Sequence, residues 1–149
     1  MQSVLDCIHG FPIALQNIVR IEHIAWQVSD PVAVAGWYGR EFGLTVLRKF
    51  NTPAQAHFLA DESGNVILEI YNNPKVSVPD YKNMDPLLLH IAFLADDLAG
   101  TRDNLVAAGA TLVDDIAFTP AGDQIVMLRD PWGFAVQLVR RKEPMLAAG

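Results

Sequence analysis

Hydrophobic and polar residues alternate, then follow helical spacing, then alternate again, and this order occurs twice along the chain. Residues 21–28 alternate with the period of a strand, whereas residues 31–42 place apolar side chains three and four apart, as a helix does. Asp30 is a natural N-cap for this helix, and Gly43 is a natural end. Three short apolar segments follow between turn residues, and they predict strands at 45–50, 56–60 and 66–71.

The second half of the chain repeats this order after a connecting segment. Residues 72–86 contain three prolines and three asparagines, which is typical of a connection. The pattern then predicts a strand at 87–94, a helix at 97–108 ended by Gly109, and strands near 111–114, 124–129 and 134–139. We therefore predict an α+β fold with two βαβββ modules, at residues 21–71 and 87–141.

Apolar strands at equivalent places in the two halves carry isolated polar residues. The sequence His-Ile-Ala occurs at residues 23–25 and at 90–92, and each last strand is interrupted by an acid or an amide. The four residues are His23, Glu69, His90 and Gln137. Each of them alone fits a hydrogen-bonded structural residue, because burial without a partner is costly. If their faces coincide, however, two imidazoles, a carboxylate and an amide oxygen converge, and we interpret them as a shared metal site.

Length and charge limit the classes of protein that the chain fits. Its 149 residues match one domain, and the net charge of −6 gives little support for binding nucleic acid or an anionic membrane. Cys7 is the single cysteine, so we expect no internal disulfide and a reducing, cytoplasmic location. No segment approaches the ~20 apolar residues of a membrane span. Residues 1–20 are expected to be an extension, and residues 142–149 a tail.

Further motifs accompany the two His-Ile-Ala strands. They are Trp37-Tyr38 before Phe42-Gly43-Leu44, the strand residues Leu68-Glu69-Ile70, and the turn Asp130-Pro131-Trp132-Gly133-Phe134 before the last strand. With these motifs the chain resembles, over about residues 20–141, the vicinal oxygen chelate superfamily of glyoxalases, bleomycin-resistance proteins and extradiol dioxygenases. The resemblance implies an eight-stranded half-barrel around a central cavity that holds a divalent ion (Zn, Ni, Co, Mn or Fe), commonly within a homodimer.

The four ligand positions of that family fall on His23, Glu69, His90 and Gln137. The resemblance thus implies a metal-dependent lyase or isomerase of glyoxalase or epimerase type, which removes a proton next to a carbonyl of a small oxygen-chelating substrate. Gln137 departs from the glyoxalase pattern because an amide takes no proton, and Glu69 is then the candidate base. Two alternatives stay open: an Fe(II) extradiol-type dioxygenase, which would need a carboxylate on the eighth strand, and a non-catalytic protein that binds an antibiotic or another small ligand.

Other polar side chains are not assigned to this site. His57 on the third predicted strand is left outside it. Four basic residues are available to an acidic substrate but are interpreted as surface charges: Arg48, Lys49, Lys82 and Arg129.

Overall fold

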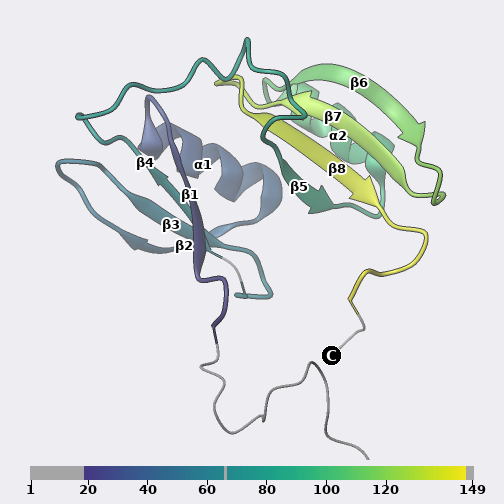
Figure 1. Cartoon of the computed structure of the whole chain (residues 1–149), viewed down its shortest axis with the longest axis horizontal. Coiled ribbons are helices and arrows are strands. Elements are labelled where there is room, and N and C mark those ends of the chain that lie inside the picture. Colours follow the sequence, from purple (N-terminus) through teal and green to yellow (C-terminus); the bar gives the residue numbers. More distant parts are fainter. Residues whose placement is uncertain (1–18, 66, 147–149) are drawn as a thin grey trace, which may run out of the picture.

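Two βαβββ modules lie side by side in the computed structural model, which describes residues 19–65 and 67–146. The first module is on the left of Figure 1, the second is on the right, and the connection between them runs across the top. The predicted α+β fold and its two modules are confirmed. Residues 1–18 and 147–149 lie outside the described residues, and they include Cys7 and most of the predicted extension.

The first module is a four-stranded sheet with one helix. Its elements are β1 (His23–Gln27), α1 (Pro31–Phe42), β2 (Thr45–Lys49), β3 (His57–Ala60) and β4 (Ile67–Tyr71). The strands are ordered β1-β4-β3-β2, with β1 parallel to β4 and the other neighbours antiparallel. β1 and β2 are therefore the edges of this sheet.

The second module repeats this topology. Its elements are β5 (Ile91–Leu94), α2 (Leu98–Ala107), β6 (Thr111–Phe118), β7 (Gln124–Arg129) and β8 (Ala135–Arg140). The strands are ordered β5-β8-β7-β6, with β5 parallel to β8. The eight predicted strands are thus divided between two four-stranded sheets, of which β1 and β5 are corresponding edges.

The second module differs from its prediction at β5 and β6. The strand predicted from residue 87 begins only at Ile91, because Leu87 N donates to Asp85 Oδ1 (2.9 Å) and Leu88 N to the Asp85 carbonyl (3.0 Å) in a turn. The prediction is wrong for residues 87–90. β6 continues beyond the predicted 111–114, because it pairs with β7 across two register shifts.

α1 begins and ends where its sequence predicts. The Asp30 carboxylate accepts a hydrogen bond from Ala33 N (3.0 Å), and Pro31 occupies the first turn, where no backbone donor is needed. Gly43 ends the helix in the left-handed region, with φ of 68°. The helix packs on β2, β3 and β4, as α2 packs on β6, β7 and β8.

Aromatic side chains of the first module join it to the second. Trp26 stacks on Phe134 with ring centroids 4.8 Å apart, and Phe42 stacks on Phe93 at 4.1 Å. Such pairs contribute about 1 kcal/mol each beyond their burial. Because these rings share one core with the helices, that core lies on the helix-covered faces of both sheets.

A buried carboxylate fixes the turn between β7 and β8. Asp130 is 3% exposed and accepts hydrogen bonds from Trp132 N and Phe134 N (both 2.9 Å) and from the Tyr38 hydroxyl (3.0 Å). Gly133 has φ of 93°, and a Cβ there would lie 2.8 Å from Lys82 N, so the turn requires glycine. The Asp-Pro-Trp-Gly motif therefore ties α1, the turn and the connection together.

No helix within the described residues is long and apolar enough to cross a membrane.

Replacing Gly36 with Ala should stabilise the protein by roughly 0.5–1 kcal/mol, because glycine in a helix interior costs conformational entropy. A Cβ at Gly36 would meet only the flexible end of Arg40, at 3.4 Å. The matched control is Gly39→Ala, whose Cβ would meet the Leu44 carbonyl oxygen at 3.3 Å and should gain less. Urea unfolding of both variants measures the difference. A Gly36→Ala variant less stable than Gly39→Ala would contradict this expectation.

Candidate functional site

Burial shows which face of each sheet is open. In β4, Leu68 and Ile70 are buried on the helix side, so Glu69 lies on the face that neither α1 nor α2 covers. His23 shares this face, because Trp26 in the adjacent β1 points into the core. In β8 the same alternation leaves Gln137 on the open face of the second sheet.

His23 and Glu69 form a close pair on the open face of the first sheet. The His23 Nε2 atom lies 3.4 Å from a Glu69 carboxylate oxygen, and the two side chains are 40% and 21% exposed. The Phe58 ring packs edge-on against the imidazole, with centroids 6.1 Å apart. Glu22 binds the other ring nitrogen, Nδ1. One imidazole therefore lies between two carboxylates, beside an apolar ring.

These carboxylates make the pair attractive to a cation. The hydrogen bond that His23 donates to Glu22 raises the pKa of His23 above its ordinary value of 6.5, and the negative charges of Glu22 and Glu69 act in the same direction against partial desolvation. A positive charge at His23 is thus stabilised by its surroundings. A divalent cation held by Glu69 and the unprotonated imidazole would be stabilised by the same negative charges.

His90 is held in one orientation directly before β5. Its Nδ1–H donates to the Pro86 carbonyl (3.0 Å), and because a carbonyl only accepts, the proton is on Nδ1. No described residue donates to Nε2, so its lone pair is available. Metal-binding histidines commonly have their second nitrogen held by a carbonyl in this way.

Gln137 is half-buried between small and flexible neighbours. Its partners across the adjacent strands are Ala92 of β5 and Met127 of β7. The Gln137 amide makes no hydrogen bond with the part of the chain that the structure describes, so its oxygen is available as a ligand.

Arg129 supports the segment that orients His90. Its guanidinium donates to the carbonyls of Tyr81 (2.7 Å), Met84 (2.7 Å) and Gly133 (3.0 Å). The interpretation of Arg129 as a surface charge is therefore wrong, because the side chain is half-buried and satisfied by backbone oxygens. The carbonyl of Pro86, two residues beyond Met84, is the one that binds His90.

The four predicted residues are divided between the two modules, and we call each pair a half-site of the predicted metal site. Among residues 19–65 and 67–146 of one chain, no three histidine, cysteine, aspartate or glutamate side chains are grouped closely enough to hold a metal. The structure brings His23 together with Glu69, whereas Gln137 lies in the other sheet and His90 directly precedes β5 at the edge of that sheet. The four-ligand metal site stays a prediction.

The sequence pattern did not indicate two groups that act on the histidines. Glu22 precedes His23, and strict alternation would place it on the opposite face, so no periodic signal points to it. The Pro86 carbonyl is a backbone group that only the turn after Asp85 brings to His90. The proline and aspartate residues that favour such a turn were the available signal.

The topology and motifs agree with a known family. The Glyoxalase/Bleomycin resistance protein/Dioxygenase superfamily matches residues 20–138, and the chain belongs to it. Among curated proteins, lactoylglutathione lyase GLX1 of Arabidopsis thaliana is 25% identical over 82% of this chain. The chain spans 44% of the length of that relative.

Solved structures show the same fold. A single-residue variant of glyoxalase I from Zea mays is 25% identical, with a TM-score of 0.66 over 83% of this chain and 46% of that one. TnmS3, an antibiotic-binding protein from Streptomyces sp. CB03234, is 18% identical, with a TM-score of 0.66 over 85% of this chain and 99% of that one. The fold is thus common to enzymes and to binding proteins.

Proposed function

We propose that the protein is a divalent-metal-dependent lyase or isomerase of glyoxalase or epimerase type, with an active site shared by two copies of the chain. His23 and Glu69 of one copy would face His90 and Gln137 of the other. The observation that carries the proposal is the His23–Glu69 pair, with a 3.4 Å separation on a sheet face that neither α1 nor α2 covers.

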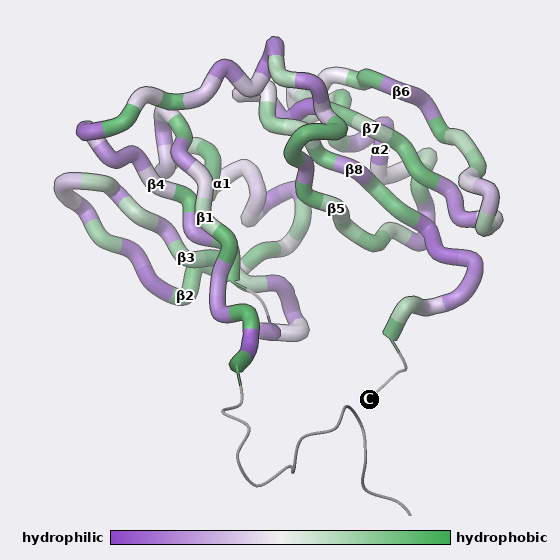
Figure 2. Tube along the Cα trace, in the orientation of Figure 1, coloured by the Kyte–Doolittle hydropathy of each residue, from purple (hydrophilic) through white to green (hydrophobic). Residues whose placement is uncertain are grey.

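Exposed hydrophobic residues along β1 and β5 support a homodimer. Among the described residues both strands are edges of their sheets, and Ile24 and Leu94 are 54% and 77% exposed. Leu87 and Leu88, in the hydrophobic segment that leads into β5 in Figure 2, are exposed as well. Proteins usually cover an apolar edge of this kind, and a second copy offers the matching edge.

The donor set fits a divalent ion of the zinc class. It offers two imidazole nitrogens, one carboxylate and one amide oxygen. Such an ion supplies Lewis-acid polarisation of the substrate carbonyl. Glu69 takes the proton from the carbon beside that carbonyl and can return it to the product. His23 positions the Glu69 carboxylate, and Phe58 covers one side of the imidazole.

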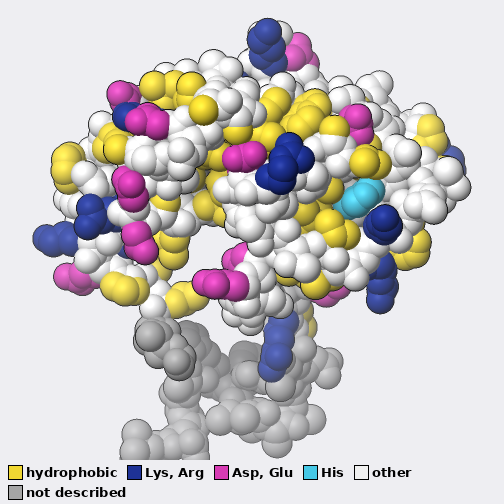
Figure 3. Space-filling view, turned by 180° about the vertical axis from the view of Figure 1, so that it is seen from behind, with side chains coloured by type: hydrophobic (Ala, Val, Ile, Leu, Met, Phe, Trp, Pro, Cys, Tyr) yellow, Lys and Arg dark blue, Asp and Glu magenta, His cyan; other side chains and the backbone are white. Residues whose placement is uncertain are grey.

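A small-molecule substrate agrees with the charge distribution. The chain carries a net charge of −6, and Figure 3 shows acidic and basic side chains interspersed on the face that it presents. Nucleic acids instead require a concentrated basic surface. A cytoplasmic location agrees with the single cysteine.

Replacing Glu69 with Gln should abolish both metal retention and proton abstraction, because it removes the only carboxylate of the donor set. Replacing Gln137 with Glu should raise metal affinity, because the second carboxylate adds one negative charge, and it can raise turnover by adding a proton acceptor. Metal analysis after desalting, with a lactoylglutathione-lyase assay and an acyl-CoA epimerase assay, measures both effects. If Glu69→Gln and Gln137→Glu both leave metal content and activity unchanged, these side chains are structural.

Two other functions use the same surfaces. A non-catalytic small-ligand protein is favoured by the neutral Gln137 and by the separation of the half-sites, and it would purify without stoichiometric metal. An Fe(II) dioxygenase would use the two-histidine, one-carboxylate set and would consume oxygen with a catechol. Its carboxylate, Glu69, lies on β4 rather than on β8.

A further inference from the structure

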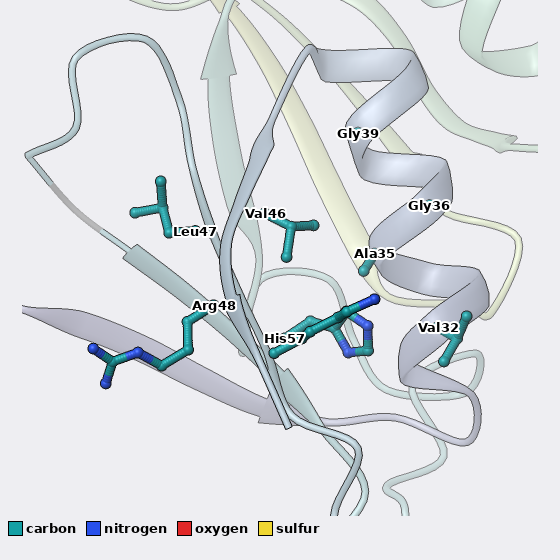
Figure 4. Close-up of a pocket in the computed structure, with 9 residues that line it drawn as sticks. Val32, Ala35, Gly36, Gly39, Val46, Leu47, Arg48 and His57 are labelled. Carbon is teal, nitrogen blue, oxygen red and sulfur yellow. The ribbon is translucent and has the colours of Figure 1, made fainter. Parts of the chain in front are cut away.

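A cavity lies on the opposite side of the first sheet from His23 and Glu69. It opens between α1 and the neighbouring strands β2 and β3, and its volume is about 630 Å³ (Figure 4). The residues that line it are Val32, Ala35, Gly36, Gly39, Val46, Leu47, Arg48, Lys49 and His57. We name this cavity the α1–β2 cleft.

Small residues on α1 keep the cleft open. Val32, Ala35, Gly36 and Gly39 recur at helical spacing, so they form one stripe along the helix. No side chain of that stripe is larger than valine. The facing strand β2 is the outer edge of its sheet, so nothing in the described structure closes the cleft from that side.

In the second module a long side chain crosses the corresponding place. Ala35 and Arg102 are each the fifth residue after the N-cap of their helix, Asp30 and Asp97. Arg102 extends from α2 to β6, where its guanidinium donates to Asp115 (2.6 Å). The same repeat therefore has a filled contact in one module and a cleft in the other.

The same comparison applies to the strand below the helix. His57 pairs with Ile70 of β4, and Val126 pairs with Leu138 of β8, so His57 and Val126 occupy equivalent places. Val126 is an ordinary core residue at 1% exposed. An apolar residue at this position is sufficient for the fold in the second module. The fold alone therefore does not explain why residue 57 is a histidine.

His57 presents one free nitrogen to the cleft. The side chain is 9% exposed, and its Nδ1–H donates to the Gln55 carbonyl (2.7 Å). This bond places the proton on Nδ1 and leaves the lone pair of Nε2 as an acceptor. Within the described residues nothing donates to Nε2, and Figure 4 shows the ring directed toward Ala35 and Val32. This nitrogen is not sealed in the core, so a ligand in the cleft can reach it.

The charged residues that line the cleft are all basic. Lys49 pairs with His57 across β2 and β3, so the two side chains lie on the same face. Arg48 also lines the cleft, although its side chain points away from His57 in Figure 4. None of the lining residues is acidic. In a chain of net charge −6, such a surface favours an anion.

We propose that the α1–β2 cleft binds a small hydroxylated carboxylate. The hydroxyl donates to His57 Nε2, the carboxylate lies near Lys49, and an apolar body of about one ring contacts Val32, Ala35 and Val46. This site is separate from the metal site, because His57 and Ile70 face α1 whereas Phe58 and Glu69 face the other way.

Titration of the full-length protein with para-hydroxybenzoate tests this proposal. Calorimetry should show one molecule bound per chain, and amide NMR signals of Ala35, Gly36 and Gly39 should shift. Benzoate, which lacks the hydroxyl, and para-hydroxybenzyl alcohol, which lacks the carboxylate, should each bind more weakly. Chelator treatment should leave binding unchanged, so failure of the metal-site proposal and failure of this one are distinguishable.

Three substitutions assign the contacts. His57→Leu should weaken binding roughly threefold to tenfold, whereas His57→Gln retains an acceptor and should lose less. Lys49→Gln should weaken binding by about twofold to fivefold and reduce its salt dependence. Gly36→Leu fills the cleft and should prevent binding without disturbing the helix. Absence of binding by the wild type, wild-type affinity in His57→Leu and Gly36→Leu, or shifts confined to the His23 region would each overturn the proposal.

Discussion

Mixed dimers of two inactive variants should recover metal binding. If the site is shared, a dimer of one Glu69→Gln chain and one His90→Ala chain has both substitutions in one site, and the other site contains the wild-type residues. Each homodimer of a single variant should retain little metal, and the mixed dimer about half of the wild-type amount, because a twofold assembly contains two equivalent sites. Co-expression with two affinity tags isolates the mixed dimer, and elemental analysis measures the metal.

A second pairing provides the control. His23→Ala and Glu69→Gln alter the same half-site, so a mixed dimer of these variants has one lesion in each site and should recover nothing. Recovery in both mixtures, or in neither while the wild type holds metal, would contradict a shared site. A wild-type protein that holds no added metal would contradict the metal-dependent function itself.

The elements were predictable because their signals are local. The N-cap at Asp30, the left-handed Gly43 and the helical spacing between them act within a few residues, and α1 matches its prediction. The start of β5 was not predictable from periodicity, because residues 87–89 are apolar enough for a strand. A single carboxylate, Asp85, determines the turn there by binding the Leu87 amide.

For the candidate site, the sequence indicated which residues correspond in the two halves, but not how those residues are arranged in space. The internal repeat identified His23 with His90 and Glu69 with Gln137, and the structure confirms that His23 and Glu69 are neighbours. Periodicity assigns each residue to a face of its own sheet, but it carries no information on how two sheets meet. Large aromatic contacts such as Trp26–Phe134 determine that arrangement, and they place the core on the helix-covered faces.

The α1–β2 cleft shows a similar limit. Val32, Ala35, Gly36 and Gly39 were within a predicted helix, but small residues alone do not distinguish tight packing from an open space. Only comparison with the second module, where Arg102 crosses to β6, shows that the first lacks a filling side chain. His57 was therefore left outside any site.

Replacing Asp130 with Ala should cost about 3 kcal/mol or more of unfolding free energy, because it leaves several donors of a buried turn without an acceptor. Those donors are Trp132 N, Phe134 N and the Tyr38 hydroxyl. Burial raises the pKa of Tyr38 well above its ordinary value, so its hydroxyl stays a donor. Asp130→Asn keeps an acceptor oxygen and should cost about 1 kcal/mol. Urea unfolding measures both, and equal losses would contradict the assigned hydrogen bonds.

Acidification should widen the difference in stability between the wild type and Asp130→Asn. Burial raises the pKa of Asp130 above its ordinary value of 3.8, against the hydrogen bonds that favour the ionised form. At pH values between the ordinary pKa and the raised pKa of Asp130, the native state binds a proton more readily than the unfolded chain does. The contribution of Asp130 to the free energy of unfolding therefore increases as the pH falls through this range.

Asparagine does not titrate, so the difference in unfolding free energy between the wild type and Asp130→Asn reports on the titration of Asp130 and not on that of other acidic residues. Asp123 acts in the opposite direction, because the Lys142 amide and then Arg141 lower its pKa, and its contribution is lost on acidification. Both chains contain Asp123, so its effect cancels in the difference. The difference in unfolding free energy should then grow from neutral pH toward the ordinary pKa of aspartate. A difference that is constant or that shrinks would show that the Asp130 carboxylate is not desolvated in the turn.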